Sequence, residues 1–340
     1  MTENAVMKKS EKAAAKPDRH KKTIRKLWIL AVITMVSVAG YLLINAHPER
    51  PSLFLYIMSL RLPALLCMII ASLSIGVATL IFQSIVNNRI VTPALLGMNS
   101  IYTFLHTAAV FVFGTGSILF VNANVSFAVD MVLMGTVATM VYWYLFKKTG
   151  HNILYIMLIG TVLSSFFGSM QSAMIRVMDP NEYDALLGNL VADFTNVNGE
   201  IILFTVAALA LIAFLLRKEL ALLDVITMGR DQAINLGVDY DNTIRKLLFG
   251  VVICIAVATA TVGPVSFLGL IVANLSRQIL KTYRHSHLIL GASLMGMIAL
   301  IGGQLVSQHI FHFTVPVSTF VTIAGGLYFL YLLLWKKGAY

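Results

Sequence analysis

The amino-acid sequence predicts an all-α polytopic membrane protein with about ten transmembrane helices, and two observations support this. Hydrophobic residues make up 58% of the chain and charged residues only 12%, whereas about a quarter of residues are charged in soluble proteins. Apolar blocks of roughly 20 residues recur between short polar stretches, and helices of that length cross a bilayer while satisfying their own backbone groups. The alternating segments of a transmembrane β-barrel are missing from the sequence.

Ten apolar segments are long enough to serve as spans. They cover residues 27–45, 62–83, 94–113, 124–146, 152–178, 201–216, 247–262, 265–280, 288–309 and 315–335. With the N-terminus inside, all but three of the 25 Lys and Arg residues fall on the cytoplasmic side, as the positive-inside rule requires. The three exceptions are Arg50, Arg61 and Arg176.

A strongly basic tail precedes the first span. Nine Lys and Arg residues lie within residues 1–26. This composition favours a cytoplasmic anchor held by anionic lipid, with a binding arm as the alternative. A cleavable signal peptide is disfavoured because residues 27–45 form too long an apolar block. We therefore divide the chain into the tail, residues 1–26, and a transmembrane domain, residues 27–340.

The apolar run over residues 247–280 is too long for one crossing and contains Gly263 and Pro264 near its middle. Basic residues lie at both ends of the run, so both ends are expected on the cytoplasmic side and the chain must turn back. Glycine permits a tight turn, and proline lacks the N–H that a continuing helix needs. We expect two short arms of roughly 24 Å each. A turn within the membrane must be covered by protein or line a cavity, which suggests a pathway nearby.

Small residues recur at positions that suggest close helix packing and internal symmetry. Ser72 with Gly76, and Ala292 with Gly296, have the four-residue spacing that lets helices approach in lipid. Residues 75–79 read IGVAT and residues 255–259 read IAVAT, in spans of opposite direction. This echo makes an inverted repeat a candidate, with chance as the alternative.

Polar groups inside the spans are few. Asp130 is the only acidic residue well inside a predicted span, which makes it a functional candidate by default. The alternative is that it reaches water near the outer end or pairs with Arg176 on the same side. His309 and His312 share a helix face, but no third metal ligand accompanies them, so we expect no metal site. The phosphate-binding pattern GxxxxGK[ST] is missing, so we expect no ATP hydrolysis by this chain and no enzyme activity.

The largest cytoplasmic segment, residues 217–246, has charges of both signs and apolar residues at helical spacing. Gly229 and Gly237 are the expected breaks between two short amphipathic helices. Such helices lie on the membrane or dock on a soluble partner, and the pattern alone leaves both open.

Three motifs resemble, in the same order, those of permease subunits of ABC importers for iron-siderophores and cobalamin, the FecCD-type family. They are RLPALLCMIIASLSIGVATLIFQSIVNNRIVTPALLG at residues 61–97, MGRDQAINLGV at residues 228–238 and GPVSFLGLIVANLSR at residues 263–277. The similarity runs from about residue 60 to the C-terminal apolar segment.

The resemblance implies a type II ABC importer permease in a bacterial cytoplasmic membrane, with both termini inside. It implies a ferric siderophore as cargo, an external siderophore-binding protein, and a second permease subunit in a homodimer or heterodimer around a central pathway. It also implies cytoplasmic ATPase subunits that hold ATP and Mg, with no cofactor on this chain and no nucleic-acid partner. The expected ATPase-coupling residues are Leu220, Leu223, Met228, Gly229, Asp231, Gln232, Leu236 and Gly237.

Departures from the family pattern refine the hypothesis. The usual Arg-Leu-Pro-Arg ends in Ala64 here, so Arg61 is the remaining candidate contact with the binding protein, and a structural role at a helix start is its alternative. The variants at residues 88–93, 273–274 and 176–194 resemble a branch associated with catechol-type siderophores. The rival hypothesis is an ion- or proton-coupled secondary transporter that uses Asp130; it predicts dependence on an ion gradient without any ATPase. An intramembrane enzyme is the least supported.

Overall fold

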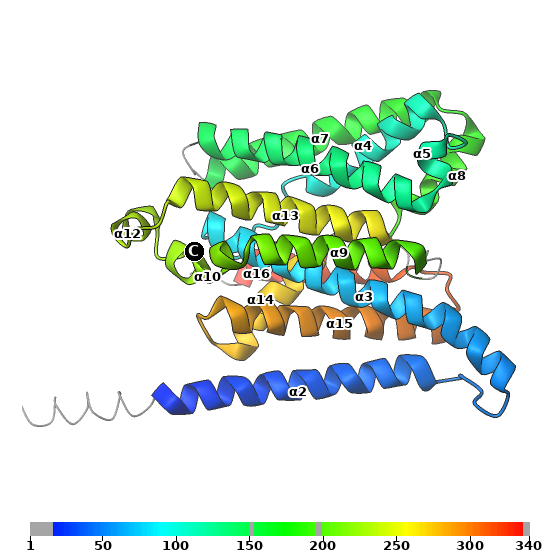
Figure 1. The fold of residues 1–340 in the computed structure, drawn as a ribbon, viewed down its shortest axis with the longest axis horizontal. Helices are drawn as coiled ribbons and strands as arrows, with labels where there is room; N and C mark the ends of the chain where they lie inside the picture. The colour runs from blue at the N-terminus through cyan, green and yellow to red at the C-terminus, as the bar shows by residue number, and fades with distance from the viewer. Residues whose placement is uncertain (1–15, 150–152, 193, 195–198, 336–340) are drawn as a thin grey trace, which may run out of the picture.

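The computed structural model describes residues 16–149, 153–192, 194 and 199–335, and its ordered elements there are all helices (Figure 1). The first fifteen residues of the predicted basic tail lie outside the described part. The helices are α2 (Lys16–Leu43), α3 (Pro51–Val86), α4 (Met98–Phe113), α5 (Ile118–Val121), α6 (Ala123–Lys148), α7 (Ile153–Val177), α8 (Pro180–Leu190), α9 (Gly199–Leu215), α10 (Arg217–Ala221), α11 (Leu223–Ile226), α12 (Arg230–Asn235), α13 (Tyr240–Val262), α14 (Leu268–Leu280), α15 (His285–His309) and α16 (Val317–Trp335).

The number and order of the spans agree with the sequence prediction. Among the described residues, six helices are long and apolar enough to cross a membrane, and four shorter apolar helices complete the set. These ten, α2, α3, α4, α6, α7, α9, α13, α14, α15 and α16, each overlap one predicted span. The all-α polytopic fold is thus confirmed.

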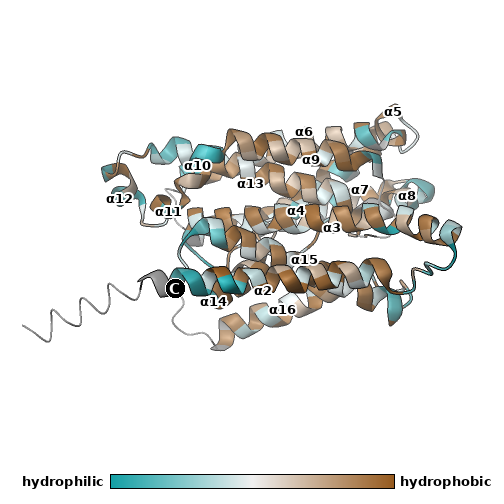
Figure 2. Cartoon of the chain, turned by 60° about the horizontal axis from the view of Figure 1, so that its bottom comes forward, coloured by the Kyte–Doolittle hydropathy of each residue, from teal (hydrophilic) through white to brown (hydrophobic). Residues whose placement is uncertain are grey.

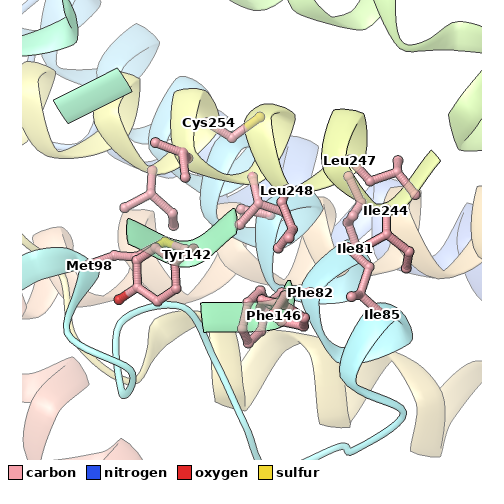
Figure 3. Close-up of a cluster of buried hydrophobic side chains, with 14 of the residues drawn as sticks. Ile81, Phe82, Ile85, Met98, Tyr142, Phe146, Ile244, Leu247, Leu248 and Cys254 are labelled. Atoms are coloured by element: carbon pink, nitrogen blue, oxygen red, sulfur yellow. The ribbon is translucent and has the colours of Figure 1, made fainter. Parts of the chain in front are cut away.

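Helices α3 and α13 form the centre of the bundle. In both helices 78% of the most apolar window is buried, against 22% in α2 and 11% in α7, whose apolar side chains face outward. Figure 3 shows one cluster where side chains of α3, α4, α6 and α13 meet, including Phe82, Met98, Tyr142 and Leu248. Because α3 and α13 run side by side in opposite directions (Figure 1), their IGVAT and IAVAT segments have the opposed orientation that an inverted repeat requires. The repeat itself stays a prediction.

Small residues let α3 and α15 approach closely. A Cβ added to Gly76 would lie 3.5 Å from the backbone of Ala292, and one added to Gly296 would lie 3.0 Å from Ser72 Cβ. The four-residue spacing seen in the sequence is therefore a helix-packing contact, as expected.

Three helices begin well before hydropathy predicts. α2 begins at Lys16 rather than at residue 27, so residues 16–26 of the predicted tail are helical. α3 begins at Pro51, eleven residues before the predicted start at residue 62, because proline is well suited to the first helical turn even outside the apolar block. α13 begins at Tyr240 rather than at residue 247, with the Asp239 side chain accepting a hydrogen bond from the Asn242 backbone N–H. The two arms of the predicted hairpin are consequently unequal, with 23 residues in α13 and 13 in α14. This corrects the expectation of two arms of equal length.

The turn between these arms lies where Gly263 and Pro264 predict it. Gly263 has φ 87° and ψ 172°, a conformation that essentially only glycine adopts. Its N–H donates to the Thr259 carbonyl at 2.8 Å and ends α13. A Cβ at this position would lie 2.8 Å from Ala192 Cα, so the segment after α8 packs directly on the turn. The turn is therefore covered by protein, as a break inside a membrane requires.

Replacing Gly263 with Ala should destabilise the fold. The added methyl group must displace the Ala192 backbone and also adopt a strained φ, so we expect a loss of about 1–3 kcal/mol. Thermal unfolding of the detergent-solubilised protein measures this, with Gly302→Ala as the control because its new Cβ would meet no heavy atom within 4 Å. Equal unfolding midpoints for the two variants would contradict the packing described.

Candidate functional site

The predicted cytoplasmic segment, residues 217–246, which we call the coupling segment, forms three short helices at one end of the bundle. α10, α11 and α12 lie at the end where α2 begins (Figure 1), and hydrophilic residues gather there (Figure 2). Sequence reasoning expected two helices. The third arises because the chain bends at Leu222, between α10 and α11.

Both predicted glycine breaks are present. Gly229 has φ 105° and Gly237 has φ 83°, backbone conformations that residues other than glycine rarely adopt. After α12, the Gly237 N–H donates to the Ile234 carbonyl at 2.9 Å and the Val238 N–H to the Ala233 carbonyl at 3.0 Å. These two bonds form a Schellman motif, which ends the helix and fixes the direction of the chain into α13.

Apolar residues of this segment divide into an inner and an outer set. Leu223, Ile226 and Ala233 are buried in the core of the bundle. Met228, Ile234 and Leu236 are 54%, 45% and 62% exposed. We call these three residues the apolar face.

The eight expected coupling residues fall on both sides of this division. Leu223 is buried and Leu220 half-buried, so these two anchor the segment; Met228, Asp231, Gln232, Leu236 and Gly237 are exposed, and Gly229 is half-buried. Ile234 belongs to the apolar face although sequence reasoning missed it. Its place inside the motif at residues 228–238, where apolar residues recur at helical spacing, was the available signal.

A chain of polar contacts joins the segment to two spanning helices. The Asp224 carboxylate on α11 accepts the backbone N–H of His285 at 3.0 Å and contacts its ring Nδ1 at 2.5 Å. The other ring nitrogen, Nε2, lies 2.7 Å from Ser84 Oγ near the end of α3. Displacement of α11 would therefore pull on the first turn of α15 and the last turn of α3. Sequence reasoning missed this contact because Asp224 and His285 are 61 residues apart.

A second ion pair fixes α10 to α13. Lys246 Nζ donates to Glu219 Oε1 at 2.8 Å. This hydrogen bond from Lys246 lowers the pKa of Glu219. The segment is thus anchored at its start and at α11, while α12 projects outward (Figure 1).

Asp130 is buried and paired, but with a different partner from the one expected. Both of its carboxylate oxygens lie 2.9 Å from Nδ1 of His106 on α4. The two side chains are 5% and 1% exposed, and the Tyr102 ring stacks on the imidazole at 5.8 Å. Arg176 is exposed near the end of α7. Neither form of the structural alternative is found: the Asp130 side chain is buried, and its partner is His106 on α4 rather than Arg176 near the end of α7.

Arg61 caps the end of another helix. Its Nη1 donates to the carbonyls of Tyr41, Leu42 and Ile44 at 2.9, 3.0 and 2.7 Å. The side chain is only 8% exposed. These carbonyls lack partners at the C-terminal end of α2, so Arg61 satisfies them. Arg61 therefore has the structural role that we gave as the alternative, although it lies inside α3 and not at the start of that helix. The binding-protein contact stays a prediction.

Among the described residues, no group of three or more His, Cys, Asp or Glu side chains is arranged to hold a metal ion.

Comparisons with known proteins place the chain in a family. The chain is 38% identical to the petrobactin import system permease protein YclO of Bacillus subtilis (strain 168), with 82% of this chain and 89% of that protein covered. It is 30% identical to the petrobactin import system permease protein FatC of Bacillus anthracis, with 96% and 94% covered.

A solved structure has the same fold. It is described as an inward-facing conformation of a metal-chelate type ABC transporter, and it aligns with a TM-score of 0.76 at 21% identity over 92% of this chain and 99% of that one. The model of the FecCD transport family matches residues 23–335. The chain therefore belongs to the FecCD transport family.

Proposed function

We propose that this chain is the permease subunit of an ATP-binding cassette importer that carries a ferric siderophore into the cytoplasm. The observation that carries the proposal is the exposed apolar face of residues 228–236, attached through Asp224 and His285 to two spanning helices. An exposed apolar patch on a short, glycine-bounded segment suits docking on a protein partner. The family and the petrobactin import named for both relatives support the cargo class.

In the proposed mechanism, movement of ATPase subunits reaches the membrane helices through α11. The apolar face contacts the ATPase, and the Asp224 carboxylate transmits displacement to the N-terminal end of α15 and to Ser84 on α3. Small shifts of packed helices then convert the bundle between inward-facing and outward-facing arrangements. ATP and Mg are held by the partner subunits, and this chain makes and breaks no covalent bond.

The remaining partners complete the proposal. An external siderophore-binding protein delivers the cargo, with Arg61 as a candidate contact, and a second permease subunit completes the pathway. The cargo is a catechol-type siderophore, which petrobactin transport by the relatives supports. The coupling end of the bundle faces the cytoplasm, and so do both termini.

Placing a charge on the apolar face should release the ATPase. We expect Leu236→Asp to abolish co-purification of ATPase subunits from detergent-solubilised membranes, because it buries a carboxylate at the contact, and Gly237→Arg to do the same by straining the turn after α12. Mass spectrometry and an ATPase assay of the eluate provide the measurement. Val191→Asp, at an exposed apolar residue outside the coupling segment, is the control. Retention of the ATPase by both coupling variants would refute docking at this face.

Removing the Asp224 carboxylate should separate ATP hydrolysis from transport. With Asp224→Ala the apolar face is intact, so the ATPase stays bound and active, while uptake into proteoliposomes should fall about tenfold. The matched control is Asp241→Ala, which removes an exposed carboxylate paired with Arg230 at 3.0 Å on the same surface. If Asp224→Ala and Asp241→Ala transport equally well, α11 does not transmit the movement.

The buried Asp130 favours one rival, a secondary transporter with a proton or ion site, and Asp130→Asn separates the two. If the pair with His106 is structural, ATP-driven uptake should persist while stability falls by about 1–3 kcal/mol, since a buried charge-assisted contact is weakened. Uptake and thermal unfolding are measured on the same preparation. Gradient-driven uptake without any ATPase, lost in Asp130→Asn, would favour the rival.

A further inference from the structure

A cavity of about 790 Å³ lies beside the coupling segment. Its walls come from the end of α3, the loop that follows it, the end of α14, the start of α15 and Thr227 of the coupling segment. Three cations, Arg89, Arg277 and Lys281, line it, and none of the residues that line it carries a carboxylate. The lining is therefore positively charged.

Some basic residues at this end are bonded within the chain. Lys246 is paired with Glu219, Arg230 with Asp241, and Arg245 donates to Asn242. Within the described part of the chain, the side chains of Arg89, Arg277 and Lys281 make no hydrogen bond or ion pair. The cavity thus concentrates cations whose acceptors are not supplied by the described part of the chain.

The loop that carries Arg89 is held in place. The Arg89 carbonyl accepts hydrogen bonds from Gln83 Nε2 at 2.7 Å and from Asn274 Nδ2 at 2.9 Å. The Asn88 side chain accepts from the Ile90 N–H at 2.9 Å. This arm of the cavity is therefore preorganised by side chains of two helices.

Arg277 gives the clearest indication of a missing partner. Its Nε is buried and has no acceptor among the described residues. Its charge and that of Arg89 repel each other. A buried charged donor without a partner is unfavourable, and an anion between the two guanidinium groups would satisfy the donor and offset the repulsion.

We propose that this cavity binds the anionic oxygens of a small molecule, and that the molecule is the ferric siderophore at the cytoplasmic end of its passage. The volume suits a small-molecule ligand rather than a single side chain. A ferric complex with two or more catecholate groups is anionic, because each catecholate carries two negative charges and ferric iron only three positive ones. This assignment rests on the proposed function.

The test uses the importer complex in nanodiscs and the ferric complex of dihydroxybenzoate as the probe, with radioactive iron counted in equilibrium dialysis. We expect Arg89→Gln and Arg277→Gln each to weaken binding about tenfold, since each removes a charge-assisted contact. Arg89 is exposed, so its variant should fold even if Arg277→Gln does not. Lys148→Gln, an exposed cation at the same end outside the cavity, should bind as the wild type does.

Two further arms separate the sources of an anion. In the first arm, inorganic phosphate replaces the ferric probe. In the second arm, no ferric probe is added, and the importer is placed in nanodiscs of phosphatidylcholine with or without phosphatidylglycerol. Binding of phosphate alone, or binding of the ferric complex that is equal in the wild type and Arg89→Gln, would overturn the proposal. Arg89-dependent binding of phosphatidylglycerol without binding of the ferric complex would assign the cavity to lipid and overturn it as well.

ATP-driven uptake by the wild type separates this inference from the proposed function. If the wild type imports ferric siderophore and the cavity variants import and bind equally well, only the cavity assignment is wrong. If the wild type complex imports none, the proposed function itself fails.

Discussion

The structure depends on one constraint, which is that a backbone carbonyl freed where a helix ends inside a membrane has no water to bind. Side chains from other parts of the chain supply the missing donors. Arg61 donates to three carbonyls at the end of α2, and Tyr142 donates to the Leu96 carbonyl at 2.6 Å in the segment before α4. Ser318 donates to Ala192 beside the Gly263 turn at 3.0 Å. These contacts permit irregular backbone inside a bundle of helices.

An N–H group without a partner at a helix start likewise explains where the coupling segment is joined to the bundle. The first N–H groups of α15 have no partner within the helix, and the Asp224 carboxylate accepts one of them. An acid at a helix N-terminus is also favoured by the helix dipole. Moving α11 away would leave that N–H group and His285 without their acceptor, so α11 and α15 are expected to move together. The proposed coupling to an ATPase then needs no contact within this chain beyond those that stabilise the resting structure.

Much of the fold follows from hydropathy and backbone chemistry, whereas the polar contacts do not. Ten spans could be placed because hydrocarbon selects long apolar segments, and the Gly263, Gly229 and Gly237 breaks could be placed because the backbone there needs glycine. The start of α3 could not, since Pro51 begins the helix outside the apolar block. Pairs such as His106 with Asp130, 24 residues apart, join different helices. Their identity depends on which helices become neighbours, and hydropathy does not determine that.

Pairing separates structural charges from ligand-facing ones in this chain. Asp130 and His106 share one buried contact, so each offsets the other's loss of water, and the pair fastens α4 to α6 without calling for an ion. Arg277 and Arg89 have no such partner in the described chain, and the backbone at Arg89 is held by hydrogen bonds from Gln83 and Asn274. Burial costs less free energy for the paired Asp130 than for a charged donor without a partner, such as that of Arg277. Only the unpaired arginines are stabilised when an anion binds. The cationic cavity, rather than the buried acid, is therefore the place to look for cargo.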